Sequence, residues 1–113
     1  MHEFAVTQGV LATVLEHAEK AKARRVTQIN LVIGDMTGII DDSVQFYFDV
    51  LSEGTIAQGA TLSFQRIPTQ MRCHHCGRIF TPQDLDWHCP DCGQLSFEVV
   101  AGKEFYVDSI EVE

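Results

Sequence analysis

Hydrophobic and polar positions alternate along the chain with two periods, which predict helices and strands. Apolar residues recur at helical spacing over residues 4–23, which predicts an amphipathic helix. The predicted buried stripe of this helix consists of Phe4, Leu11, Val14, Ala18 and Ala21. Over residues 26–33 the period changes to two, with Ile29, Leu31 and Ile33 on one face, which predicts a strand.

A second helix is predicted over residues 43–53. Asp42 precedes it as an expected cap, and Gln45 stands three residues later, as in a capping box. The buried face expected for this helix is Val44, Tyr47, Phe48 and Leu51.

Two further strands are predicted outside the cysteine-containing segment, at residues 61–67 and 104–112. In the last strand, Tyr106, Ile110 and Val112 are expected on one face and Phe105 and Val107 on the other. This strand has no core of its own, so we expect it to return to the first two strands. The predicted fold is α+β (α/β-type), with two helices on a small mixed three-stranded sheet and an inserted zinc-ribbon module. The expected domains are 1–70 plus 99–113, and 71–98.

Four cysteines form two C-x-x-C-G repeats, at Cys73, Cys76, Cys89 and Cys92. Each repeat is typical of a zinc knuckle, because glycine after the second cysteine allows the turn that points backbone amides at sulfur. A redox dithiol, two disulfides or a rubredoxin-like iron site are the alternatives. Four thiolates fill a tetrahedral site, so we expect a structural rather than a catalytic zinc.

The chain is acidic, with sixteen Asp and Glu against eight Lys and Arg and a formal net charge of -8. Such a charge disfavours binding to nucleic-acid phosphates and favours a basic protein partner or a cation. The longest apolar runs fall short of the about 20 residues of a membrane helix, and no signal peptide is visible. We therefore expect a cytoplasmic protein without a membrane or nucleic-acid partner.

The first three residues, Met1-His2-Glu3, can form a metal chelate at a free N-terminus. The α-amine, the His2 amide nitrogen and the His2 imidazole supply three nitrogens in nearly one plane, a geometry that suits Ni²⁺ or Cu²⁺. Glu3 can add an oxygen or offset the charge of the metal. No Ser/His/Asp grouping, phosphate loop or open metal site is visible, so we do not expect an enzyme. The alternative function is a zinc-ribbon module that binds nucleic acid or protein and has no nickel function.

The combination of Met1-His2-Glu3, a first amphipathic helix, Ile33-Gly34 and the four-cysteine ribbon resembles the HypA/HybF family of nickel metallochaperones. The resemblance implies Ni(II) on Met1, His2 and Glu3 as transported cargo, and structural Zn(II) on the four cysteines. It also implies a HypB-type GTPase and the large subunit of [NiFe]-hydrogenase as partners. We expect the chain to be a monomer or a homodimer.

The histidine pattern departs from some members of that family. Gly77 and Gly93 stand where those members carry a histidine, whereas His74, His75 and His88 lie inside or before the repeats. We expect these three imidazoles to be exposed or hydrogen-bonded beside the ligands rather than to replace a cysteine.

Overall fold

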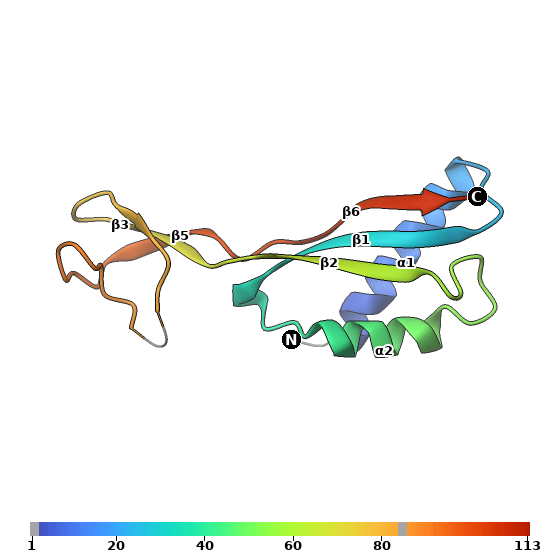
Figure 1. Ribbon diagram of the computed structural model, residues 1–113, viewed down its shortest axis with the longest axis horizontal. Coiled ribbons are helices and arrows are strands. Elements are labelled where there is room, and N and C mark those ends of the chain that lie inside the picture. Colours follow the sequence, from blue (N-terminus) through green and yellow to red (C-terminus); the bar gives the residue numbers. More distant parts are fainter. Residues whose placement is uncertain (1–2, 84–85) are drawn as a thin grey trace.

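The computed structural model describes residues 3–83 and 86–113. It contains two helices and six strands (Figure 1). In chain order these are α1 (Glu3–Lys20), β1 (Val26–Gly34), a 3₁₀ turn (Asp35–Thr37), α2 (Asp41–Leu51), β2 (Thr61–Ile67), β3 (Gln70–Cys73), β4 (Ile79–Phe80), β5 (Phe97–Ala101) and β6 (Phe105–Val112). The molecule measures 55 × 24 × 17 Å and has a larger and a smaller lobe joined by a narrow waist.

The larger lobe is a three-stranded sheet in the order β2-β1-β6, with both helices on one face (Figure 1). β1 runs parallel to β2 and antiparallel to β6. A parallel pair needs a crossover connection, and α2 lies in the crossover between β1 and β2. The predicted mixed sheet, its two helices and the return of the last strand to the first are confirmed.

The core of this lobe lies between the sheet and the helices. Ile29, Leu31 and Ile33 of β1 are buried against Val14 of α1 and Phe48 of α2. The opposite face of β1 carries the buried Val32 and two polar residues. The Gln28 side-chain amide donates to the Asn30 side-chain oxygen at 2.8 Å, and Asn30 donates to the Ser109 hydroxyl at 2.9 Å. The predicted common face of Ile29, Leu31 and Ile33 is therefore confirmed, and Val26 joins the same core.

The first helix differs from the prediction in its buried stripe and its end. The residues buried along it are Thr7, Val10, Val14 and Ala18, and the helix ends at Lys20 rather than at residue 23. Thr7 can occupy a buried position because its hydroxyl donates to the backbone oxygen of Glu3. Phe4 lies outside the core with 45% of its surface exposed, and its ring contacts Tyr47 of α2 edge to face.

The predicted cap of the second helix is wrong. The helix begins at Asp41 with Ile40 as its N-cap, so Asp42 lies inside the first turn. Gln45 takes no part in a capping box, since its side-chain amide donates to Asp49 at 2.8 Å. The backbone N–H of Ile40 instead donates to a Glu3 carboxylate oxygen at 3.4 Å. A carboxylate from another helix therefore occupies the place that Glu or Gln takes in a capping box.

The smaller lobe is a second three-stranded sheet, in the order β4-β3-β5, with all pairs antiparallel. It has its own small core of Met71, Phe80 and two cysteines, against which Trp87 and Phe97 pack. The sheet begins at Gln70 and ends at Ala101, close to the segment predicted as the metal module. The exact division of the chain into domains stays a prediction.

Backbone contacts hold the two lobes together at the waist. The N–H of Gly34 donates to the Glu104 oxygen at 2.7 Å, and the N–H of Met36 donates to the Gly102 oxygen at 2.8 Å. A side chain at position 34 would overlap the backbone of Gly102, so only glycine fits there. Neither helix of the described residues is long and apolar enough to cross a membrane.

Candidate metal centre

The two C-x-x-C-G loops of the smaller lobe fold in the same way. The N–H of Gly77 donates to the Cys73 oxygen, and the N–H of Gly93 donates to the Cys89 oxygen, both at 2.9 Å. Both glycines have a positive φ, of 77° and 75°. That backbone conformation is unfavourable for residues with a side chain, which explains the glycine after each pair of cysteines.

A second pair of hydrogen bonds repeats in the two loops. The N–H of Cys73 donates to the Arg78 oxygen and the N–H of Cys89 donates to the Gln94 oxygen, each at 2.9 Å. Each loop is therefore closed from both sides and presents its two sulfur atoms inward. The two C-x-x-C-G loops, which repeat in the sequence, therefore also have similar structures, and their sulfur atoms gather at one place.

The four Sγ atoms lie within 4.8 Å of one another and form a group that could hold a metal ion. The Cys73–Cys92 and Cys76–Cys89 sulfur distances are 3.5 and 3.6 Å, and all four thiols are free. A tetrahedral ion with Zn–S bonds of about 2.3 Å needs sulfur atoms about 3.8 Å apart, so the donor set fits Zn²⁺. The alternative of two disulfides does not match this arrangement, because an S–S bond is about 2.05 Å long.

The surroundings of two of these thiols shift their pKa values in opposite directions. The N–H of Cys76 and, less strongly, that of His75 donate to Cys73 and lower the pKa of its thiol to about 7. At Cys92 the N–H of Gln94 lowers the pKa of the thiol, but burial and the neighbouring cysteines together outweigh this effect and raise the pKa to about 12. Without an ion, a thiolate at one sulfur therefore opposes ionisation at another, and a bound cation removes this conflict.

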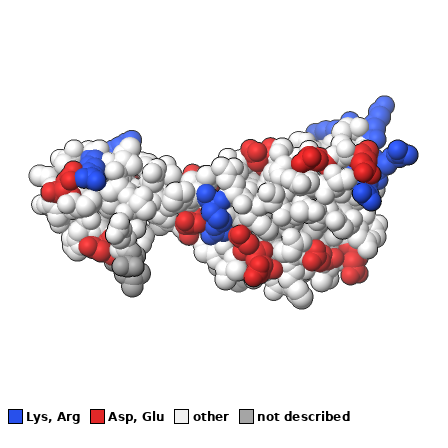
Figure 2. Space-filling view, viewed as in Figure 1, with Lys and Arg blue, Asp and Glu red and all other residues white. Residues whose placement is uncertain are grey.

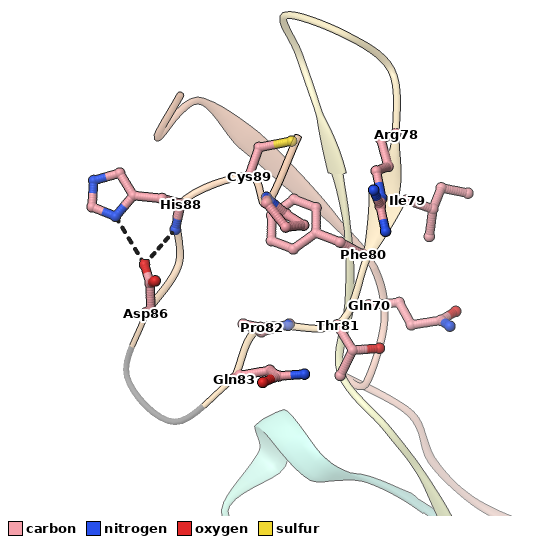
Figure 3. Close-up of a pocket in the computed structure, with 11 residues that line it drawn as sticks. Gln70, Arg78, Ile79, Phe80, Thr81, Pro82, Gln83, Asp86, His88 and Cys89 are labelled. Atoms are coloured by element: carbon pink, nitrogen blue, oxygen red, sulfur yellow. Dashed lines mark hydrogen bonds and ion pairs between the residues drawn. The ribbon is translucent and has the colours of Figure 1, made fainter. Parts of the chain in front are cut away.

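The three histidines beside the cysteines are exposed, and none belongs to the sulfur group. His74 Nδ1 lies 3.0 Å from the Ser96 hydroxyl, and His88 Nδ1 lies 2.9 Å from the Asp86 carboxylate. Figure 3 shows the imidazole of His88 turned toward Asp86 and away from the sulfur of Cys89, at the rim of a hollow of about 490 Å³. The geometry agrees with the expectation that these histidines do not replace a cysteine.

Of the predicted nickel ligands, only Glu3 belongs to the described residues; Met1 and His2 lie outside them. Glu3 begins α1, is partly exposed, and accepts the hydrogen bond from the Ile40 N–H at the start of α2. The sequence contains no local signal for this contact, because its partners are 37 residues apart.

Arg66 at the end of β2 fixes the segment that contacts Glu3. Its Nε lies 3.0 Å from the Asp35 carboxylate, and its Nη1 lies 2.9 Å from Asp41 and 3.0 Å from the Ile39 carbonyl oxygen. One guanidinium thus joins the 3₁₀ turn, the loop before α2 and the first residue of α2. No local pattern in the sequence marks this arginine, because Asp35 and Asp41 are 31 and 25 residues away.

Comparisons with known proteins agree with this structure. A family model described as "Hydrogenase/urease nickel incorporation, metallochaperone, hypA" matches residues 1–112. A hydrogenase maturation factor HypA of Dehalococcoides mccartyi is 47% identical over 113 residues, covering 100% of this chain and 95% of the relative. One of Caldanaerobacter subterraneus is 46% identical over 114 residues and covers both chains completely.

Solved structures support the fold. The solution structure of a HypA protein superposes with a TM-score of 0.74 at 24% identity, covering 100% of this chain and 97% of the other. The solution structure of the Ni metallochaperone HypA from Helicobacter pylori gives a TM-score of 0.68, also at 24% identity, over 99% and 97% of the two chains. The family model and the relatives show that the chain belongs to the HypA family of hydrogenase/urease nickel-incorporation metallochaperones.

Proposed function

We propose that the chain binds Ni(II) through Met1, His2 and Glu3 and delivers it during maturation of [NiFe]-hydrogenase. The observation that carries the proposal is the nickel-metallochaperone family match, which includes the terminal tripeptide. With Met1 as the free terminus, its amine, the His2 amide nitrogen and the His2 imidazole offer the nearly planar nitrogen donors that Ni(II) accepts.

The start of α1 favours this chelate in two ways. The positive end of the helix dipole disfavours a protonated amine and imidazole, so the neutral forms that bind metal are favoured. The same dipole repels the cation, and the Glu3 carboxylate offsets this repulsion. The contact of Glu3 with the Ile40 N–H holds that carboxylate at the start of α2, beside the terminus.

Structural Zn(II) on Cys73, Cys76, Cys89 and Cys92 is the second part of the proposal. The spacing of the sulfurs and their amide hydrogen bonds fit this ion. When bound, it supplies folding free energy to the smaller lobe. Because four cysteines leave no open coordination position, this centre has no role in hydrolysis.

We further propose a HypB-type GTPase and the large subunit of [NiFe]-hydrogenase as partners, in the cytoplasm, where free thiols persist. The net charge of -8 supports contact with a basic protein surface. No part of the proposal requires nucleic acid.

An extension before Met1 tests the nickel site directly. Adding one residue converts the amine to an amide and moves the free amine away, while every side chain stays in place. We expect the native protein to bind one nickel ion per chain, and the extended protein to bind it at least tenfold more weakly, in titrations followed by absorbance. His2→Ala should have the same effect, because it removes the imidazole.

Two controls make this result specific. Intact mass spectrometry of the native protein should show that Met1 is retained, and zinc content and circular dichroism should be the same in all variants. If the extended protein binds nickel with unchanged affinity and spectrum, the proposed chelate is wrong. The ligands would then be sought among His74, His75 and His88.

A further inference from the structure

The outer face of α2 exposes large apolar side chains beside the candidate nickel site. Phe46 and Val50, one helical turn apart, are 64% and 51% exposed. Ile40, which caps the helix, is 60% exposed. Isolated apolar residues are common on protein surfaces, but a group on one helix face indicates an interaction site.

The aromatic part of this face is held in a fixed arrangement. Tyr47 contacts both Phe4 of α1 and Phe46, with ring centroids 5.4 Å apart in each pair and the rings edge to face. These contacts reduce the rotamer freedom of Phe4 and Phe46 before any partner arrives. Ordered aromatic side chains lose little entropy on binding, which is why such residues dominate interface energetics.

Acidic side chains surround these apolar residues. Asp42, Asp49 and Glu53 lie on the exposed side of α2 and the turn after it. The sequence has no lysine or arginine between Arg25 and Arg66. Figure 2 shows acidic side chains along the edge of the larger lobe where α2 lies, and basic side chains at the far end of that lobe and near the waist.

We propose that the outer face of α2, formed by Phe4, Ile40, Asp42, Phe46, Asp49 and Val50, is the docking surface for the GTPase partner. The partner surface that fits it is basic and carries apolar anchor side chains. Opposite charges around an apolar centre steer association and exclude wrong partners. This inference rests on the proposed function and assigns its partner contact to α2 and the adjoining Phe4 of α1.

A second copy of the chain does not fit this surface. In a two-fold symmetric dimer the same patch meets itself, so Asp42 and Asp49 of one copy would be brought close to the same acidic residues of the other. Like charges brought together in this way are destabilising. A basic partner has no such conflict.

The position of the surface explains why a nickel carrier would use it. Phe4 follows Glu3 in the sequence, and the backbone N–H of Ile40 donates to the Glu3 carboxylate at 3.4 Å. A protein bound on this face would therefore lie next to the terminal ligands, and nickel would pass between the partners without crossing bulk water.

Two substitutions on this face test the assignment against the purified HypB-type GTPase from the same organism. Phe46→Ser should weaken the affinity at least tenfold in calorimetry, because it removes an ordered aromatic anchor. Asp49→Asn should slow association and reduce its dependence on salt. Phe46 is largely exposed, so its loss leaves the core intact, which circular dichroism and zinc content should verify.

Matched controls lie on β6, an edge strand of the larger sheet. Tyr106 and Asp108 of β6 are exposed, and neither belongs to the α2 face. Tyr106→Ser and Asp108→Asn should leave the affinity unchanged.

A wild-type chain that does not bind the GTPase would refute the partner in the proposed function, and this inference with it. Binding that is strong in wild type and equal in Phe46→Ser would refute the α2 surface alone. A wild-type dimer that Phe46→Ser dissociates would make a second copy the occupant and also overturn the proposal.

Discussion

At the residue scale, Gly34 sets how closely the two lobes approach. It ends β1, its N–H donates to Glu104 at 2.7 Å, and a Cβ atom there would overlap the backbone of Gly102. We predict that Gly34→Ala lowers the free energy of unfolding by about 1–3 kcal/mol, because backbone atoms must move to accept the methyl group. Chemical denaturation of the zinc-loaded protein measures the change.

Gly9 provides a control with the opposite sign. It lies inside α1, and apart from its neighbours and the backbone of its own helix no atom of the described residues lies within 4 Å of the position that its Cβ would take. Gly9→Ala should therefore stabilise the protein by about 0.5–1 kcal/mol through its higher helix propensity. Equal effects of the two substitutions would show that the contact of Gly34 with Gly102 does not constrain the waist.

At the element scale, both β1 and β6 were predicted as strands, but only the buried face of β1 was predicted correctly. Regular alternation in the sequence predicted the buried face of β1 correctly. In β6, Val107 pairs with Leu31 and Ser109 pairs with Asn30, so Asp108 has no partner in the ladder and forms a β-bulge. The bulge shifts the alternation by one residue, and Ile110 packs in the core with Phe105 and Val107. The predicted grouping of Ile110 with Tyr106 is wrong for this reason.

The bulge leads to a prediction about shortened strands. Deleting Asp108 should leave the pairing of Ser109 with Asn30 and of Ile110 with Ile29 in place, because the deletion removes only the unpaired residue. We expect the free energy of unfolding to change by less than about 1.5 kcal/mol, with hydrogen exchange of the β1 amides unchanged.

Deleting Tyr106 instead is the matched control. This deletion moves Val107 from the core face to the outer face, so β6 should lose its buried contacts. The free energy of unfolding should fall by several kcal/mol as a result. If the two deletions destabilise the protein equally, the bulge is not a separable feature of the strand.

The same distinction between local and distant signals applies to the site. The sulfur cluster was predictable because each loop makes its own turn, with Gly77 or Gly93 in the required conformation. The clamp of Arg66 on Asp35 and Asp41 was not, since its partners are 31 and 25 residues away and follow no period. The cap of α2 by Glu3 was missed for the same reason: tertiary contact, not local sequence, supplies the acceptor.

At the scale of the whole molecule, the two lobes have separate cores. The larger lobe buries a continuous cluster between its sheet and helices, including Ile29, Leu31 and Phe48. The cluster of the smaller lobe consists of Met71, Phe80 and two of the four cysteines. Two short chain segments, 68–69 and 102–104, connect them. Loss of structure in one lobe therefore need not spread to the other.

This separation predicts what removal of the metal does. A lobe with so small an apolar core depends on its ion for folding free energy, so a chelator under reducing conditions should unfold β3 to β5 and leave the larger lobe folded. Trp87 is the only tryptophan and packs against Phe97 at 5.8 Å, so its fluorescence reports the smaller lobe alone. Both helices lie in the larger lobe, so far-ultraviolet circular dichroism reports that lobe.

We expect tryptophan fluorescence to change and the β3 and β5 amides to lose hydrogen-exchange protection when the metal is removed, while the helical signal and the protection of β1 persist. Lowering the pH should give the same result, because protons compete with the metal for the thiolates. Returning one equivalent of zinc at neutral pH should reverse it. Protection of β3 and β5 that is unchanged without metal would mean that the apolar contacts of Met71 and Phe80 suffice to fold the smaller lobe. Loss of protection in β1 at the same time would mean instead that the backbone hydrogen bonds at the waist couple the two lobes into one cooperative unit.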